Sequence, residues 1–141
     1  MTEPVPPEGY QPHFRQSPFT DPWEPLFSRV TQEQVSIGLW LRTPHCNSRG
    51  LVHGGLIAAL ADNAMGLSCG EVVRRSGRDI TGLVTVSLTT DYIGSAKLGQ
   101  WLATDTHFLR AGGSLAFADC FLKADGETIA RANASFKILT R

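Results

Sequence analysis

The clearest pattern in the chain is an almost uninterrupted apolar segment between His53 and Arg75. Two glycines open it, two arginines stand in its last turn and Gly77 follows, which is the order of end signals typical of an α-helix. Its middle is apolar on nearly every face and therefore predicts a buried helix rather than a surface one. Small residues recur along it and leave a stripe where another backbone could approach closely, at Gly55, Ala59, Gly66 and Gly70.

Alternating apolar and polar residues predict strands on both sides of this helix. One begins at Gln34, and the others lie at residues 84–89, 101–110, 114–123 and 129–138, with an Asp125-Gly126 hairpin signal between the last two. Strands joined by short turns favour an antiparallel sheet, and strands of about 10 residues match the length of the helix. We therefore expect an α+β fold in which a curved antiparallel β-sheet wraps around one long central helix.

The first 25 residues hold most of the prolines, which disfavour regular helix and sheet. Their aromatic residues are nevertheless too apolar for a purely disordered tail. We expect an arm whose beginning is mobile and whose later part packs aromatic rings onto the domain. The predicted organisation is a proline-rich arm over residues 1–25 and one domain over residues 26–141, and 141 residues are enough for one domain only.

Composition and charge mainly exclude classes of partner and of site. Thirteen Lys and Arg balance thirteen Asp and Glu, so the chain lacks the positive field expected of partners of nucleic acid or anionic membranes. The longest apolar run, Leu56–Ala61, is far shorter than the ~20 residues of a membrane span, and no signal segment opens the chain, which predicts a cytoplasmic protein. Three cysteines without a C-x-x-C pair predict reduced, mostly buried thiols. His45, Cys46 and His53 lack a fourth ligand at a familiar spacing, so we expect no metal site.

Two features carry candidate chemistry. Asp62 is the one charged residue in the apolar middle of the helix, and a carboxylate there is either functional, or hydrogen-bonded to a neighbouring Ser or Thr, or on a solvated edge. The second feature is the start of the helix at Gly54 and Gly55, where unpaired N–H groups favour negative charge, including an oxyanion on an acyl carbonyl. The alternative for these glycines is only a turn and a cap.

The spacing of these two features has a consequence. Asp62 follows Gly54 by eight residues, which is about 12 Å along a helix axis. A general base and an oxyanion donor must both lie within ~3 Å of one reacting group and its water. If both act, the site must be shared between subunits, and two antiparallel helices in a twofold dimer would create two such sites.

Several blocks of the chain, namely Asn47, His53-Gly54-Gly55, Leu60-Ala61-Asp62, Thr85, and residues 91–99 and 110–117, resemble a known family. They are similar to the hotdog-fold acyl-CoA thioesterases, in particular the phenylacetate-pathway (PaaI-like) branch, from about residue 26 to residue 139. The resemblance implies the hotdog fold, active sites at subunit interfaces, and hydrolysis of an acyl-CoA thioester to free acid and coenzyme A.

The resemblance also implies a role for each matching residue. Asp62 matches the carboxylate that activates water or attacks the thioester directly, and Gly54 matches the backbone N–H that polarises the thioester carbonyl. Asn47 and His53 match residues that orient carbonyl and water, and Thr85 matches one that positions the water. Two stretches and one lysine match residues that hold coenzyme A: Tyr92, Ile93, Gly94, Ser95, Lys97, Arg110, Gly112, Gly113, Ser114 and Lys137.

We therefore expect a thioesterase acting on a small-molecule acyl-CoA as a homodimer or homotetramer, with no cofactor besides the coenzyme A of its substrate. Two alternatives stay open. A hotdog enoyl-CoA hydratase or dehydratase would need a histidine and a carboxylate converging as an acid–base pair. A non-catalytic acyl-CoA-binding protein on the same fold would bind without turnover. The sequence leaves open whether the acyl group is aromatic or aliphatic.

Overall fold

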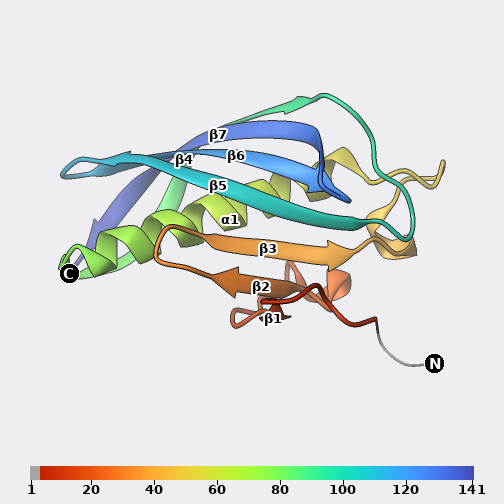
Figure 1. The fold of residues 1–141 in the computed structure, drawn as a ribbon. Helices are drawn as coiled ribbons and strands as arrows, with labels where there is room; N and C mark the ends of the chain where they lie inside the picture. Colours follow the sequence, from red (N-terminus) through yellow and green to blue (C-terminus); the bar gives the residue numbers. More distant parts are fainter. Residues whose placement is uncertain (1–3) are drawn as a thin grey trace.

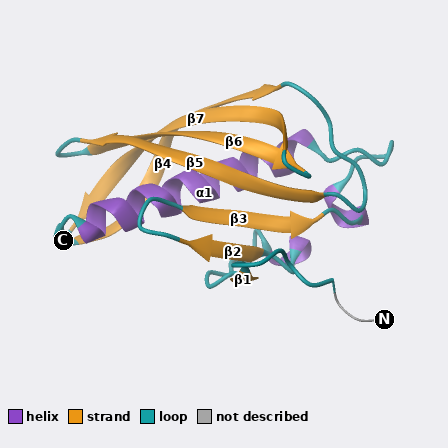
Figure 2. Ribbon diagram, in the orientation of Figure 1, coloured by secondary structure: helices purple, strands orange, loops and turns teal. Residues whose placement is uncertain are grey.

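One long helix lies against a curved antiparallel sheet in the computed structural model, which describes residues 4–141 (Figure 1). The helix α1 spans Gly54–Arg75, and two short 3-10 helices span Asp21–Trp23 and Thr43–His45. The strands are β1 (Gln11–Pro12), β2 (Phe27–Val30), β3 (Val35–Trp40), β4 (Ile80–Tyr92), β5 (Trp101–Ala111), β6 (Leu115–Ala124) and β7 (Glu127–Thr140). The predicted α+β architecture is confirmed (Figure 2).

The seven strands lie in the order β1-β2-β3-β5-β6-β7-β4, and all neighbours are antiparallel. The chain leaves β3, passes through α1 and returns at the far edge of the sheet as β4, which pairs with β7 alone. Thr85 on β4 lies opposite Phe136 on β7. This crossover places the middle of β4 beside the middle of α1.

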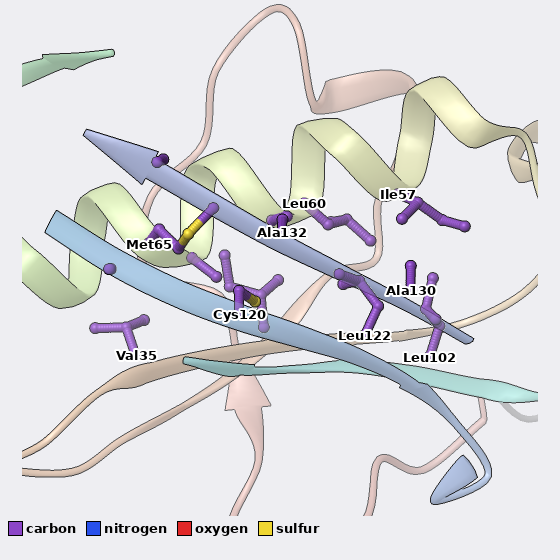
Figure 3. Close-up of a cluster of buried hydrophobic side chains, with 14 of the residues drawn as sticks. Val35, Ile57, Leu60, Met65, Leu102, Cys120, Leu122, Ala130 and Ala132 are labelled. Carbon is purple, nitrogen blue, oxygen red and sulfur yellow. The ribbon is translucent and has the colours of Figure 1, made fainter. Parts of the chain in front are cut away.

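The core lies between α1 and the concave face of the sheet (Figure 3). Ile57, Leu60 and Met65 of the helix point toward apolar side chains of β5, β6 and β7, such as Leu102 and Leu122, and all five are at most 2% exposed. Burial of this kind contributes about 25 cal/mol per Å² of apolar surface, so packing outweighs the glycines within the helix.

The opposite side of α1 is only partly covered. Ala58, Ala59, Asp62, Asn63 and Gly66 are half-buried, so the prediction of a helix buried on every face is correct only for the side toward the sheet. By length and mean hydropathy α1 also resembles a membrane span, which the count of consecutive apolar residues had missed, but 56% of its most apolar stretch is buried inside this protein.

The proline-rich segment joins the sheet through more contacts than predicted. Gln11 and Pro12 pair with β2, and the Tyr10 hydroxyl lies 2.7 Å from Ser36 Oγ on β3. Trp23 packs against the core, whereas Phe19 is 65% exposed and its ring lies nearly perpendicular to that of Trp23, with 5.0 Å between the ring centroids. Strand β2 itself was not predicted, because Phe27 and Ser28 are both buried and break the alternation. Residues 1–3, where the arm was expected to be mobile, lie outside the described residues.

Candidate active site

Asp62 and Thr85 meet at the middle of the helix. Asp62 lies on the half-covered side of α1, and the Thr85 hydroxyl on β4 donates a hydrogen bond of 2.6 Å to Asp62 Oδ1. A hydrogen bond to an ionised acceptor is short and holds the carboxylate in one orientation. Its second oxygen, Oδ2, accepts no hydrogen bond from the described residues, so it is available to a water or a substrate.

These two residues line a cavity of about 300 Å³. The cavity lies between α1, β4, β7 and the N-terminal segment, and much of its wall is apolar, including Leu60, Leu83 and Phe136. Apolar side chains and polar or charged ones share this wall, and a concave site that combines the two is suited to a small ligand. Its polar wall on the arm side consists of His13, Arg15, Ser17 and Thr20.

The start of the helix forms a second cluster. His53 is the N-cap of α1, and its Nδ1 accepts a hydrogen bond of 2.8 Å from the Gly55 N–H. The Gly54 N–H takes part in no hydrogen bond among residues 4–141. The Tyr92 hydroxyl donates to the Gly54 carbonyl at 2.7 Å, and a Cβ on Gly54 would lie 3.2 Å from the Tyr92 ring. The structure therefore leaves one N–H available at this end of the helix, beside an aromatic ring.

The loop before the helix is held by its own side chains. Asn47 Oδ1 accepts hydrogen bonds from the N–H groups of Arg49 and Leu51, at 2.9 and 3.3 Å. Leu51 pairs with Lys97 as an isolated bridge, and the Val52 N–H donates to the Ala96 carbonyl. Asn47 and Lys97 thus lie at the same end of the helix as Gly54, with the Asn47 carbonyl oxygen engaged in the loop.

His45 is a structural residue of this loop. It is 1% exposed, its Nδ1 accepts the Arg42 N–H at 2.9 Å, and its Nε2 lies 2.9 Å from the Trp23 carbonyl. Burial lowers the pKa of His45, as does the nearby Arg42 guanidinium, while the bond to Trp23 opposes them. The neutral imidazole with its proton on Nε2 satisfies both bonds.

The cysteines and possible metal ligands are dispersed. The three cysteines are free; burial raises the pKa of Cys69 to about 12 and that of Cys120 to about 11, which keeps both as thiols. No three His, Cys, Asp or Glu side chains cluster as metal ligands within residues 4–141.

The residues predicted to hold coenzyme A divide between the two ends of the sheet (Figure 1). Residues 92–97 follow β4 near the start of α1, where Ile93 and Gly94 donate their N–H groups to the Ile129 carbonyl. Ser95 is exposed in the same loop. Gly112, Gly113 and Ser114 form the β5–β6 turn at the opposite end, next to Arg110 near the end of β5, and the Ser114 carbonyl accepts a hydrogen bond from the Ile138 N–H.

Arg110 and Lys137 do not reach Asp62 within one chain. Lys137 follows the buried Phe136 on β7, and Arg110 lies opposite the exposed Phe117 on β6. Because side chains alternate along a strand, both cations lie on the outer face of the sheet, away from the helix. They therefore form a separate positive surface at the turn end.

One residue that contacts the β5–β6 turn was missed by sequence reasoning. Arg78 donates hydrogen bonds to the carbonyls of Gly112 and Gly113, at 2.7 and 2.8 Å. Nothing in the local pattern signals this contact, because the partners are 34 and 35 residues away. Arg78 therefore holds the turn in place through its backbone.

Asp62 and the Gly54 N–H remain apart in the single chain, as the eight-residue spacing requires: about 12 Å of helix separates them. Thr85 and Tyr92 are likewise about 23 Å apart along β4. The chain by itself therefore presents two half-sites, one at Asp62 and one at Gly54.

The free edge of β4 lies beside the half-covered side of α1. Six consecutive residues of β4, Val84–Thr89, are exposed on both faces, among them Val84, Val86 and Leu88 at 51%, 61% and 36%. An apolar edge strand with unpaired backbone groups is a template for pairing with another chain.

Comparison with known proteins agrees with this architecture. Residues 49–130 match the Thioesterase superfamily. A protein of Pseudomonas aeruginosa, provisionally named an esterase, is 36% identical over 133 residues, covering 94% of this chain and 96% of its own. Human acyl-coenzyme A thioesterase 13 is 40% identical over 91 residues, which cover 62% of this chain and 60% of the human protein.

Solved structures show the same fold. The zebrafish thioesterase superfamily member 2 has a TM-score of 0.75 at 26% identity and covers 87% of this chain and 88% of its own. The phenylacetic acid degradation protein PaaI of Thermus thermophilus, in a mutant form, has a TM-score of 0.72 at 20% identity, covering 87% and 100%. A Streptococcus pneumoniae thioesterase solved with coenzyme A has a TM-score of 0.68 at 18% identity, covering 77% and 83%. The chain therefore belongs to the Thioesterase superfamily and has the hotdog fold of its PaaI-like members, as the sequence predicted.

Proposed function

We propose that this protein is an acyl-CoA thioesterase in which Asp62 is the general base or the nucleophile. The observation that carries the proposal is the Asp62 carboxylate, oriented by Thr85 on the wall of a cavity with both apolar and polar side chains, in a chain of the Thioesterase superfamily. The acyl group enters the cavity and its thioester lies beside Oδ2. Either Asp62 takes a proton from water, which attacks the carbonyl and gives the free acid, or Asp62 attacks the carbonyl and forms an acyl anhydride that water then hydrolyses. In both routes the thiolate of coenzyme A leaves and becomes the thiol with the proton that the water supplies.

The oxyanion donor in this proposal is the Gly54 N–H of a second subunit. Within one chain the two groups are about 12 Å apart, which is too far for one reacting centre. The exposed β4 edge and the small residues on the uncovered side of α1 support a twofold dimer with antiparallel helices. Each of its two sites would combine one Asp62 with the partner's helix start, where the partner's Tyr92 lies.

The residues that we propose for binding coenzyme A also lie at the two ends of the sheet. The loop at residues 92–97 belongs to the half-site of Gly54, and residues 110–114, at the end of β5 and in the β5–β6 turn, lie at the other end of the sheet. Arg110 and Lys137 would contact phosphates, for which a guanidinium supplies paired donors. The support is their exposure on one outer face, with no ion pair to either among the described residues.

The direct test is hydrolysis of a panel of acyl-CoA thioesters, measured through the release of the free thiol. Asp62→Asn should lower kcat by about 10²–10⁴-fold, as expected for loss of a positioned base. Asp79→Asn is the matched control, because Asp79 is exposed and paired with Arg141. Wild-type turnover by the Asp62→Asn protein would refute the proposal, and tight binding without turnover by the wild type would favour the acyl-CoA-binding alternative.

A second experiment tests the shared site. Gly54→Pro removes the N–H, and proline is accepted at the first helical position after the extended His53, whose ψ is 132°. Gly54→Ala keeps the N–H and places the same Cβ against Tyr92. Mixed after co-refolding, inactive Asp62→Ala and Gly54→Pro chains should recover about a quarter of wild-type activity, since half of the dimers would contain one intact site. No recovery, with heterodimers present, would exclude the shared site but leave Asp62 untouched.

One observation supports the hydratase alternative. His13 lines the same cavity as Asp62, and a histidine with a carboxylate is the pair that hydration of an enoyl-CoA needs. An assay of water addition to a trans-2-enoyl-CoA, measured as the loss of absorbance of the conjugated double bond, separates the two activities. We expect cleavage of the thioester and no hydration.

A further inference from the structure

The N-terminal segment contributes an unsatisfied polar group to the acyl cavity. His13 is 9% exposed and forms part of the cavity wall. Its Nδ1 and Glu24 Oε1 are the two buried side-chain polar atoms without a hydrogen-bond partner in residues 4–141, and of these residues only His13 lines the cavity. A buried polar atom without a partner costs about 1–3 kcal/mol, so this position calls for a partner that the chain does not supply.

The two hydroxyl groups of this wall have hydrogen-bond partners. The hydroxyls of Ser17 and Thr20 lie 3.0 Å apart, and the Thr20 hydroxyl also donates to the Ser17 carbonyl. The backbone of His13 is fixed, because its N–H donates to the Leu26 carbonyl at 2.9 Å and the preceding residues pair with β2. Nδ1 is itself shielded from solvent in this rotamer, and a 180° flip of the imidazole about its Cβ–Cγ bond exchanges Nδ1 with Cδ2 without moving the segment.

Two cations border the same cavity. Arg15 and Arg74 line it, and neither takes part in the four ion pairs formed within residues 4–141. The guanidinium of Arg74 turns back along α1, where a Cβ on Gly70 would lie 3.1 Å from its Nη1. Burial, and then the charge of Arg15, lowers the pKa of His13, so at neutral pH the imidazole is uncharged and available as a hydrogen-bond donor.

We propose that the acyl group carries an oxygen-bearing polar group, a hydroxyl or a carboxylate, at the end remote from the thioester, and that His13 binds it. An unsubstituted alkyl chain would leave His13 Nδ1 without a partner, and a hydrogen-bonding site discriminates strongly against ligands that lack the bonding group. The thioester lies at the Asp62 and Thr85 part of the cavity, and the oxygen lies at the wall of His13, Arg15 and Arg74. This inference rests on the proposed thioesterase function and specifies its substrate class.

The experiment compares three acyl-CoA thioesters of equal chain length: unsubstituted, ω-hydroxy and ω-carboxy. The wild type should show kcat/KM at least about tenfold higher for an oxygen-bearing chain, the size of one hydrogen bond to a buried group. His13→Phe keeps an aromatic ring and removes both nitrogens, so the ratio of kcat/KM between the oxygen-bearing and the unsubstituted chain, measured within this variant, should fall to near one. His107→Phe, at an exposed position on β5, is the matched control and should keep the preference.

The same series of thioesters distinguishes whether the polar group of the acyl chain is a carboxylate or a hydroxyl. If it is a carboxylate, the Arg15→Ala, Arg74→Ala double variant should lower the ω-carboxy to ω-hydroxy ratio about tenfold. If it is a hydroxyl, that ratio should not change. Equal or better hydrolysis of the unsubstituted chain by the wild type, or an unchanged preference in His13→Phe, would overturn the inference and leave the thioesterase function intact.

Binding of non-hydrolysable thioether analogues to Asp62→Asn, measured by calorimetry, gives a second readout that does not need turnover. The same order of affinities is expected, with the advantage of the oxygen-bearing analogue lost when His13→Phe is added. Absence of binding for all three analogues would overturn the inference together with the proposed function.

Discussion

The hydroxyl of Thr85 lies 2.6 Å from Asp62 Oδ1 and joins the edge strand to the middle of the helix. The two residues are 23 positions apart in the chain, and the crossover from α1 to the far edge of the sheet brings them together. The bond occupies one carboxylate oxygen and leaves the other for chemistry. Thr85 thus acts on the reaction through Asp62, as a positioning residue.

Thr85→Val should lower kcat about tenfold to a hundredfold with little change in KM, because a hydrogen bond to a charged group contributes about 1.5–3 kcal/mol. Thr85→Ser keeps the hydroxyl and should retain most of the activity. The measurement is steady-state kinetics on one acyl-CoA for all three proteins. A valine variant that turns over like the serine variant would show that the bond does not position Asp62.

Arg78 should affect binding of the nucleotide part and not the chemistry. Arg78→Ala removes both bonds to the Gly112 and Gly113 carbonyls, so the turn loses its fixed geometry. We expect KM for an acyl-CoA to rise about tenfold while kcat stays within a factor of two, the pattern for lost uniform binding. Arg75→Ala, which breaks only an exposed pair with Glu71, is the control. An unchanged KM in Arg78→Ala would remove this turn from the coenzyme A site.

The parts that could be predicted from the sequence are those with local causes. The helix begins at Gly54 with His53 as its cap, one residue from the predicted start, because capping and glycine signals are local. Asp62 was predicted to be functional, hydrogen-bonded to a Ser or Thr, or on a solvated edge, and the bond to Thr85 shows that a partner is present. Strand β4 spans Ile80–Tyr92 and is therefore longer than the predicted strand at residues 84–89. Its exposed residues show no burial pattern in a single chain, so periodicity could not give its full length.

The parts that could not be predicted depend on distant partners. The Tyr92 hydroxyl reaches Gly54 across 38 residues, and Arg78 reaches the β5–β6 turn across 34. His13 stands in a proline-rich segment whose composition indicates little structure, yet pairing of Gln11 and Pro12 with β2 places it on the cavity wall. Side-chain periodicity carries no information on such contacts, because topology and loop path determine them.

Acid should destabilise the fold through His45. Its pKa lies below 6.5 in the folded protein because burial disfavours the charged ring, so the unfolded chain binds a proton that the folded chain resists. The stability contributed by neutral His45 is therefore complete above pH 6.5 and is lost as the pH falls below that value. Urea unfolding between pH 7.5 and 5 should show this decline, and it should be shallower in His45→Asn, which cannot titrate.

His13 contributes in the same direction, because burial lowers its pKa as well. The decline that remains in His45→Asn should therefore shrink further in a double variant with His13→Phe. A slope in His45→Asn equal to that of the wild type would show that protonation of His45 is not coupled to unfolding.

Gly38 should be intolerant of any side chain, because Trp101 occupies the space above it. A Cβ at Gly38 on β3 would lie 2.8 Å from Cη2 and 2.9 Å from Cε2 of Trp101, whose ring also meets the edge of Tyr10 in the N-terminal segment. Gly38→Ala should lower the free energy of unfolding by about 1–3 kcal/mol through overpacking. It should also speed proteolysis within residues 4–25, since a displaced Trp101 no longer supports Tyr10. Gly82→Ala on β4, where a Cβ meets nothing within 4 Å, is the control and should change neither quantity. Equal stability of the two variants would mean that Trp101 has another position available and does not anchor the segment.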